Sequence, residues 1–247
     1  MATKLEAPAQ EPRNVDGGGT ASLAGVSRAF GAVRALDGLD LEVGAGEIVA
    51  VVGPSGCGKT TLLELVCGLQ APDAGSVRAD PAVLMPQRDG LLPWLRAIDN
   101  AALALRLAGA SRGQARERAH PLFAAFGLEG FERARPHELS GGMRQRVAFL
   151  RTLLSGKPVL CLDEPFAALD ALTRREMQDW LAQALLQEPR TVLLVTHDVE
   201  EAARLGDRVV VLSPRPGRVV AQLAVPRPRS EADVQAVRER ALEALRA

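Results

Sequence analysis

Short runs of consecutive apolar residues alternate with segments of helical spacing over most of the chain. The runs are rich in Val, Ile and Leu, which is typical of strands that are buried on both faces. They lie at residues 48–52, 83–85, 159–162, 191–196 and 208–212. Segments between them, such as 59–67 and 173–186, place apolar residues at helical intervals. Strands that alternate with helices predict an α/β fold with a mostly parallel sheet and right-handed crossovers.

Three parts of the chain depart from this alternation. Residues 22–27 and 39–43 alternate apolar with polar positions, which predicts half-buried antiparallel strands. Residues 88–156 are rich in Ala, Leu and Arg at helical spacing, so we expect a helical subdomain inserted into the α/β domain. Residues 214–228 are rich in Pro and Arg, and we expect a strand and loops there.

The two ends of the chain differ from the domain between them. Residues 1–20 are polar, with two prolines and three consecutive glycines, and we expect a disordered tail there. They contain no apolar segment of the kind found in signal peptides. We therefore expect the main domain at residues 21–229, followed by a charged helix at 230–247 to which we assign no function.

Composition excludes several classes of protein. The 247 residues carry 30 basic and 30 acidic side chains, and this zero net charge argues against a nucleic-acid partner. No apolar run reaches the roughly 18 residues that a membrane span needs. The three cysteines, Cys57, Cys67 and Cys161, form no even disulfide framework, which indicates a reducing compartment. Cys67 and Cys161 are expected to be buried core residues.

Residues 53–60 read Gly-Pro-Ser-Gly-Cys-Gly-Lys-Thr, between a predicted buried strand and a predicted helix. This is the phosphate-binding pattern, in which a lysine and a hydroxyl residue follow the last glycine. Its glycines let backbone N–H groups point at phosphate oxygens, and the positive end of the next helix points at the same anion. Lys59 would reach the β- and γ-phosphates, and Thr60 would bind Mg²⁺. The simpler alternative is a glycine-rich turn before a helix.

A second apolar strand, at 159–162, runs directly into Asp163, Glu164 and a proline. Ligands of open α/β sheets lie at the carboxyl ends of the strands, so Asp163 would point at Mg²⁺, directly or through water. Glu164 is then well placed to orient and deprotonate an attacking water. A turn with two solvated acids is the alternative.

The segment Leu-Ser-Gly-Gly-Met-Arg-Gln-Arg at 139–146 stands just before a long helical pattern. Ser140 is a favourable N-cap, and the two glycines after it leave backbone N–H groups open. This predicts a second anion site, at a helix N-terminus. A helix that is simply well capped is an equally good interpretation of this segment alone.

These motifs occur in one order together with others. After the phosphate loop come Gln87, Leu-Ser-Gly-Gly at 139–142, Asp-Glu-Pro at 163–165, Ala-Leu-Asp at 168–170 and Thr-His-Asp at 196–198. From about Leu23 to Arg229 the chain closely resembles the nucleotide-binding subunits of ATP-binding cassette (ABC) transporters. The resemblance implies a P-loop NTPase (RecA-like) core, with an antiparallel β subdomain and an inserted α-helical subdomain.

The resemblance implies a set of residues that bind ATP and its Mg²⁺. Phe30 matches the position of an aromatic residue that stacks on adenine. The chain has no Tyr, but stacking needs only a π-face, so Phe can serve. A Phe in the core or in a turn is the alternative. Thr60, Gln87 and Asp163 would hold Mg²⁺. The residues expected to bind ATP are Phe30, Gly53, Pro54, Ser55, Gly56, Cys57, Gly58, Lys59, Thr60 and Thr61.

The resemblance further implies that two such chains meet head to tail. The signature segment of one chain would face the γ-phosphate held by Lys59 of the other, and Asp170 would contact the other chain. The segment consists of Leu139, Ser140, Gly141, Gly142 and Met143.

Three residues would have catalytic roles by the same resemblance: Glu164, His197 and Gln87. Gln87 would sense Mg²⁺ and the attacking water. His197 would contact the γ-phosphate and help to place Glu164. A histidine that is satisfied by Asp198 at a helix start is the alternative.

Separate cassettes of this length are similar to the energy subunits of bacterial importers. Leu-Leu-Pro-Trp at 91–94 and Leu-Ser-Pro-Arg-Pro-Gly-Arg at 212–218 are similar to the nitrate, sulfonate and taurine importer group. Met-Pro-Gln-Arg-Asp at 85–89 is also similar to cassettes for pyrimidine-type thiamine precursors. Trp94 would lie on the face that receives the membrane subunit, although a half-buried Trp at a helix start is an equal alternative.

The resulting expectation is an ATPase subunit of an importer for a small solute. Its partners would be a second copy or a related cassette, an integral membrane permease and, indirectly, a solute-binding protein. It would lie at the cytoplasmic face of the cell membrane as a peripheral subunit. A non-transport ABC ATPase is the alternative. A nucleotide-binding module with a dead site is disfavoured, because Lys59, Asp163, Glu164 and His197 are all present.

Overall fold

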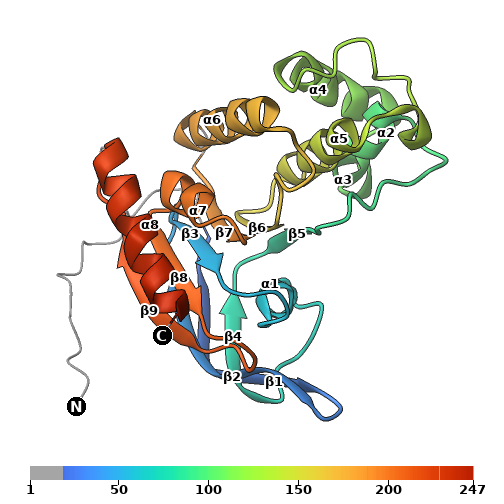
Figure 1. Cartoon of the computed structure of the whole chain (residues 1–247). Helices are drawn as coiled ribbons and strands as arrows, with labels where there is room; N and C mark the ends of the chain where they lie inside the picture. Colours follow the sequence, from blue (N-terminus) through green and yellow to red (C-terminus); the bar gives the residue numbers. More distant parts are fainter. Residues whose placement is uncertain (1–18, 188, 228, 247) are drawn as a thin grey trace, which may run out of the picture.

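A six-stranded sheet forms the centre of the molecule. The structure is a computed structural model that describes residues 19–187, 189–227 and 229–246. The strand order is β5-β6-β7-β3-β8-β9, and only the β8–β9 pairing among them is antiparallel (Figure 1). The predicted α/β class is confirmed. The strands span β3 Ile48–Val52, β5 Ala82–Met85, β6 Val159–Asp163, β7 Thr191–Thr196, β8 Arg208–Leu212 and β9 Val219–Ala224.

The continuous apolar runs arise because each central strand faces two hydrophobic cores. Successive side chains of a strand point to opposite faces. In β3, Val49 and Val51 pack into the core that contains α1 (Lys59–Val66) and the small sheet. Ala50 and Val52 pack into the other core, against the remaining helices. A strand covered on both faces needs apolar residues at every position, which is the pattern of the sequence.

A three-stranded antiparallel sheet covers one face of this centre, in the order β2-β1-β4. It consists of β1 Ala21–Phe30, β2 Val33–Val43 and β4 Ala74–Ala79. The first two were predicted, although over shorter ranges. Strand β4 was not predicted, because almost all of its side chains are exposed and its sequence therefore has no alternation of apolar and polar residues. Gly75 in β4 approaches β1 so closely that a Cβ there would lie 2.4 Å from the Ala24 carbonyl oxygen.

Helices between β5 and β6 form an arm that projects from the sheets (Figure 1). The arm and the helices that follow it meet in an aromatic cluster. The Phe126 ring meets Trp180 edge to face at 4.1 Å between centroids, and Phe149 packs against both. The helices of the arm are α2 Ala97–Ala101, α3 Leu103–Leu107, α4 Arg112–Ala125 and α5 Gly141–Leu153, with a 3₁₀ turn at Pro136–Glu138. The later helices are α6 Ala171–Gln187, α7 Val199–Leu205 and α8 Glu231–Arg246.

The expected tail at 1–20 falls mostly on residues 1–18, which lie outside the described residues. Of its last two residues, Gly19 accepts a hydrogen bond from the Thr191 hydroxyl through its carbonyl, and Thr20 donates its N–H to Asp80 Oδ2 at 2.7 Å. Within the described residues, no helix combines the length and apolar character needed to cross a membrane.

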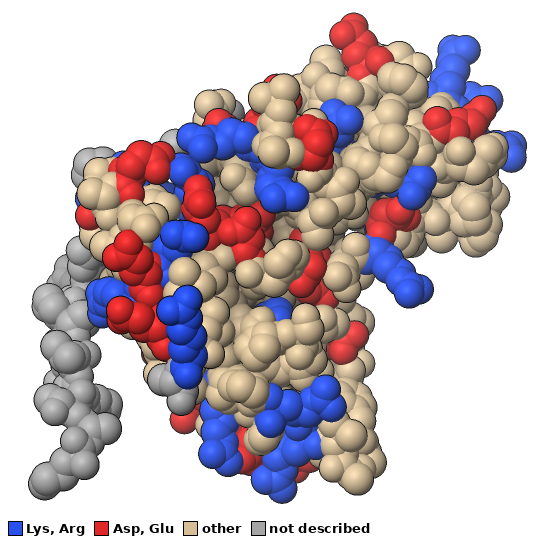
Figure 2. Space-filling model, viewed as in Figure 1, with Lys and Arg blue, Asp and Glu red and all other residues tan. Residues whose placement is uncertain are grey.

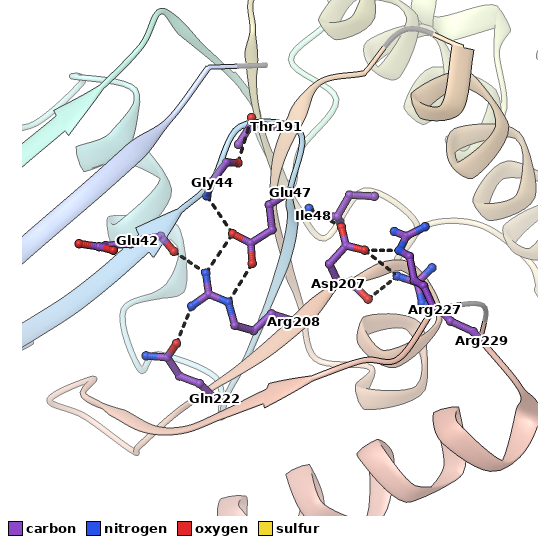
Figure 3. A network of polar contacts seen from close by, with 11 residues as sticks. Glu42, Gly44, Glu47, Ile48, Thr191, Asp207, Arg208, Gln222, Arg227 and Arg229 are labelled. Atoms are coloured by element: carbon purple, nitrogen blue, oxygen red, sulfur yellow. Dashed lines mark hydrogen bonds and ion pairs between the residues drawn. The ribbon is translucent and has the colours of Figure 1, made fainter. Parts of the chain in front are cut away.

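A polar joint connects the two sheets at the edge where β3 and β8 begin (Figure 3). Arg208 donates two hydrogen bonds, of 2.9 and 3.1 Å, to the Glu47 carboxylate. It also donates to the Glu42 carbonyl oxygen in β2 and to the Gln222 side chain in β9. Glu47 in turn accepts the Gly44 N–H at 2.8 Å. One guanidinium therefore ties β2, β8, β9 and the turn before β3 together.

We expect Arg208→Ala to lower the free energy of unfolding by about 1–2 kcal/mol, because Glu47 and the Glu42 carbonyl lose a charged donor. Urea unfolding without nucleotide measures this value. Arg34→Ala is the matched control, since it removes one exposed pair with Asp37 and should change stability by less than about 0.5 kcal/mol. Equal stability of the two variants would contradict a structural role of the joint.

Candidate functional site

Three parallel strands end side by side and bring the predicted site residues to one edge of the sheet. The register pairs Val52 of β3 with Thr196 of β7, and Asp163 of β6 with Val195 of β7. The phosphate loop (residues 53–60) follows β3 directly, and Glu164 and His197 follow the other two strands. Residues that are more than a hundred positions apart in the sequence therefore share one edge.

A cleft of about 360 Å³ opens at this edge. Most of its lining belongs to the predicted ATP-binding and catalytic set. Gly53 and Cys57 of the phosphate loop are buried and do not line the cleft, and Gly53 has no room for a Cβ beside the Cys57 sulfur. The residues that line the cleft are Phe30, Val33, Ala35, Ser55, Gly56, Gly58, Lys59, Thr60, Thr61, Gln87, Asp163, Glu164 and Arg215.

The phosphate loop is held by its own lysine. The Lys59 side chain is almost completely buried and donates from Nζ to the carbonyl oxygens of Gly53, at 2.7 Å, and Pro54, at 3.0 Å. No carboxylate of the described residues pairs with it. Helix α1 starts at Lys59 without a side-chain cap, so its first N–H groups are open to an anion. Gly58, at φ 100°, allows the sharp entry into this helix.

Thr60 and Asp163 form a pair of oxygen donors beside the loop. The Thr60 hydroxyl donates to Asp163 Oδ2 at 2.8 Å. Burial raises the pKa of the Asp163 carboxyl, the charge of Glu164 raises it further, and the Thr60 hydrogen bond and Lys59 act in the opposite direction. A buried carboxylate of raised pKa gains from a nearby cation.

The donor set fits Mg²⁺ bound together with a nucleotide. Among the described residues, no group of three or more His, Cys, Asp and Glu could hold a metal by itself. Mg²⁺ in nucleotide sites typically uses one or two protein oxygens, with phosphate and water oxygens completing its octahedron. Thr60 and Asp163 supply two hard oxygens, and Gln87 lines the same cleft.

Glu164 stands between Gln87 and His197. Its Oε2 accepts from Gln87 Nε2 at 3.1 Å, and its Oε1 lies 3.2 Å from His197 Nδ1. The backbone of Glu164 has φ 47°, an unfavourable left-handed conformation for a residue with a Cβ. Its N–H donates to the Val195 carbonyl at 2.8 Å, which holds it there. A carboxylate that is oriented from both sides can accept a proton from a water in the cleft.

Phe30 lines the cleft and does not lie in the core. Its side chain is 46% exposed, and the Arg28 guanidinium lies 5.0 Å from the ring centroid. The open ring face is therefore available for a planar ligand.

The signature segment and Asp170 do not line the cleft of their own chain. Ser140 caps α5 by accepting the Met143 N–H at 3.2 Å, and Gly142 packs beside Leu169. Asp170 accepts the Thr173 N–H at 3.0 Å, and this bond lowers the pKa of its carboxyl. Ser140, Gly141 and Asp170 are exposed on the single chain.

Three lining residues were not predicted as site residues: Val33, Ala35 and Arg215. Arg215 donates Nε to the Gly56 carbonyl oxygen at 3.0 Å, across 159 positions of sequence. The sequence of its segment, 212–218, is similar to one importer group. Neither periodicity nor spacing along the chain predicts that this segment contacts the phosphate loop.

Comparison with known proteins finds relatives that are ATP-binding proteins of ABC transporters. A family model described as ABC transporter matches residues 36–167. The chain is 46% identical over 202 residues to the taurine import ATP-binding protein TauB of Chromobacterium violaceum, covering 78% of this chain and 77% of that protein. It is 44% identical over 215 residues to an uncharacterized ABC transporter ATP-binding protein, MJ0412, of Methanocaldococcus jannaschii, covering 82% and 80%.

Among solved structures, the dimeric ATP-binding cassette MJ0796, in a post-hydrolysis state with ADP and Pi, matches with a TM-score of 0.76. The sequence identity is 29%, and the match covers 83% of this chain and 99% of that one. The likeness therefore includes sequence as well as fold.

We expect Asp163→Asn to stabilise the nucleotide-free protein at about pH 7, since the raised pKa means that ionisation of Asp163 opposes folding. The gain over wild type should shrink as the pH falls and vanish below the unfolded-state value of 3.8, where the carboxyl is protonated in both states. Urea unfolding at several pH values tests this. The exposed Asp179→Asn serves as the control for loss of a surface carboxylate. A variant that is less stable than wild type at neutral pH would contradict the expectation.

Proposed function

This chain belongs to the ABC transporter family, and on that premise we propose that it energises the uptake of a small solute, such as taurine, another sulfonate or nitrate. Its family makes it an ATP-binding subunit that hydrolyses ATP in a coupled transport cycle. The observation that carries the catalytic part is the position of Glu164 between Gln87 and His197, in the same cleft as the phosphate loop.

In the proposed reaction the residues of the cleft divide the work. The phosphate loop and Lys59 bind the triphosphate and stabilise the charge that develops on its terminal phosphoryl group. Thr60 and Asp163 would hold Mg²⁺, with Gln87 beside them, and the ion would supply positive charge to the phosphate groups. Glu164 accepts the proton of a water that attacks in line, and His197 keeps the carboxylate oriented toward that water. Phe30 stacks on the adenine.

A second copy, or a related cassette, would complete the site. The signature segment (residues 139–143) has open N–H groups at the start of α5 but lies outside its own cleft. A second molecule, placed head to tail, brings such a helix N-terminus to the γ-phosphate. The dimeric state of the related cassette MJ0796 supports this arrangement.

The membrane permease would dock at the turn that carries Trp94. This side chain is 66% exposed, so it is not the half-buried residue that the alternative interpretation required. The turn is rigid, because the fully buried Asn100 accepts the Leu92 N–H at 2.8 Å and donates to the Leu92 carbonyl at 3.1 Å. A rigid turn that presents a large amphipathic ring suits a protein interface. The chain would thereby lie peripherally at the cytoplasmic face of the membrane.

The proposed solute class rests on the relatives. TauB of Chromobacterium violaceum bears taurine import in its name, and its likeness extends over 78% of this chain. The motifs at 91–94 and 212–218 support the same group. The solute never contacts the cassette in this scheme, so its identity has to be tested through transport.

Glu164→Gln should lower ATP hydrolysis by at least about a hundredfold, because the amide cannot take the proton from water. ATP binding should persist, and ATP should hold the variant as a dimer. Phosphate release measures hydrolysis, and light scattering during size exclusion in the presence of ATP measures the dimer. The exposed Glu243→Gln controls for loss of a carboxylate elsewhere. Wild-type turnover in the Glu164 variant would show that another group acts as the base.

In a host that lacks the gene, uptake of at least one of labelled taurine, an alkanesulfonate and nitrate should fall to a small fraction of the wild-type rate. The wild-type gene should restore uptake, and Glu164→Gln should not. Unchanged uptake of all three solutes would refute the solute class and leave the ATPase assignment standing. Restoration by Glu164→Gln would instead refute the energising role.

A further inference from the structure

The turn between β8 and β9, residues 213–218, is fastened against the phosphate loop. Its backbone closes on itself, since Ser213 N–H donates to the Arg218 carbonyl at 2.9 Å. Gly217 then joins it to β2 by donating to the Ala35 carbonyl at 2.8 Å and accepting the Asp37 N–H at 3.2 Å. These hydrogen bonds fix the turn to β2, next to the phosphate loop.

Gly217 shows how closely this turn approaches the loop. A Cβ at this position would lie 2.1 Å from the Cys57 carbonyl oxygen, a distance that no side chain tolerates. The glycine allows the backbones of the turn and the phosphate loop to touch. Side chains of the turn therefore lie within reach of the phosphate loop and of the cleft that it lines.

Arg215 is the side chain that uses this proximity. Its Nε donates to the Gly56 carbonyl at 3.0 Å, and the residue lines the cleft together with Phe30 and Lys59. In the described part of the chain no carboxylate pairs with it. By contrast, Arg218 of the same turn is paired with Asp37, which holds the pKa of that carboxyl below its usual value. The two arginines of the turn therefore differ in pairing: Arg218 has a carboxylate partner, and Arg215 has none among the described residues.

The charge balance of the cleft calls for such a cation. A nucleoside triphosphate brings several negative charges to a cleft whose wall already includes Asp163 and Glu164. Lys59 supplies one compensating charge, and Arg215, which is bonded to the Gly56 carbonyl, supplies a second. Figure 2 shows Lys and Arg side chains gathered over the region where Figure 1 places β1 and β2. An unpaired positive charge favours anionic ligands.

The bond to Gly56 has a second effect, on the loop itself. The Gly56 carbonyl and the Cys57 N–H belong to one planar peptide group and point in opposite directions. The Gly56 carbonyl accepts from Arg215, and the Cys57 N–H on the other side of the same peptide donates to the Pro54 carbonyl at 3.3 Å. That long bond is easily exchanged for a phosphate oxygen.

The geometry points to Arg215 as a nucleotide-binding residue, whose guanidinium, held on Gly56, stabilises the polyphosphate of the bound nucleotide alongside Lys59. This inference goes beyond the proposed import function, because it concerns nucleotide binding whichever solute is transported. It also gives the turn at 213–218 a role that the motif alone did not reveal.

The test compares Arg215→Ala, Arg215→Gln and Arg215→Lys with wild type for binding of Mg-ATP and of ADP. Dissociation constants come from displacement of a fluorescent nucleotide analogue, at about 50 mM and about 500 mM salt. Arg34→Ala is the control, since Arg34 is an exposed arginine that pairs with Asp37 and does not line the cleft. Thermal unfolding without nucleotide is recorded for every variant.

We expect Arg215→Ala and Arg215→Gln to weaken ATP binding by about tenfold at low salt, and by less at high salt, where the charge is screened. Arg215→Lys should lie between these variants and wild type, because it keeps the charge without the forked donors. Thermal stability and the Arg34 control should stay close to wild type.

Two results would overturn the inference. One is an unchanged affinity for ATP in Arg215→Ala. The other is a loss of affinity that is equal at both salt concentrations and is not relieved in Arg215→Lys, because that would make Arg215 a support of the turn and not a charge that acts on the nucleotide.

Discussion

The parallel pairing of β6, β7 and β3 is the constraint on which the rest of the structure depends. Its register places Val52 opposite Thr196, and Asp163 opposite Val195, so that the segments after all three strands leave the sheet at one edge. A slip of one residue would turn every side chain of a strand to the opposite face, away from its core. The two hydrophobic cores thus enforce the register, and the register assembles the cleft.

Electrostatics and strain at that edge follow from the same arrangement. Glu164 adopts a left-handed backbone that costs about 1–2 kcal/mol, and the bond of its N–H to β7 holds it there. Burial disfavours the charge on Asp163, and the buried Lys59 is bonded to neutral carbonyls. The protein keeps these charged groups in an arrangement that a nucleotide and its metal ion would stabilise. These residues lower the stability of the free protein, and binding of the nucleotide and its metal ion can restore that stability.

Prediction from the sequence succeeded where a segment carries its own signal. The apolar runs became the strands of the central sheet, because a strand covered on both faces must be apolar throughout. Strand β4 was missed, since its exposed side chains have no periodicity. Arg215 was missed as a site residue for a different reason: its partner, Gly56, is 159 positions away, and only the contact of the two loops makes them neighbours.

The sequence by itself determined the chemistry and the family. The glycines, lysine and hydroxyl of residues 53–60, and the acids after the strand at 159–162, are recognisable because their backbone requirements are local. Only the tertiary structure decided which side chains meet. Glu164 lies between Gln87 and His197, and Arg215 rests on Gly56, because the sheet register and the packing of the β8–β9 turn bring them there. Hydrogen bonds require contact within about 3 Å, and spacing along the chain cannot encode such long-range contacts.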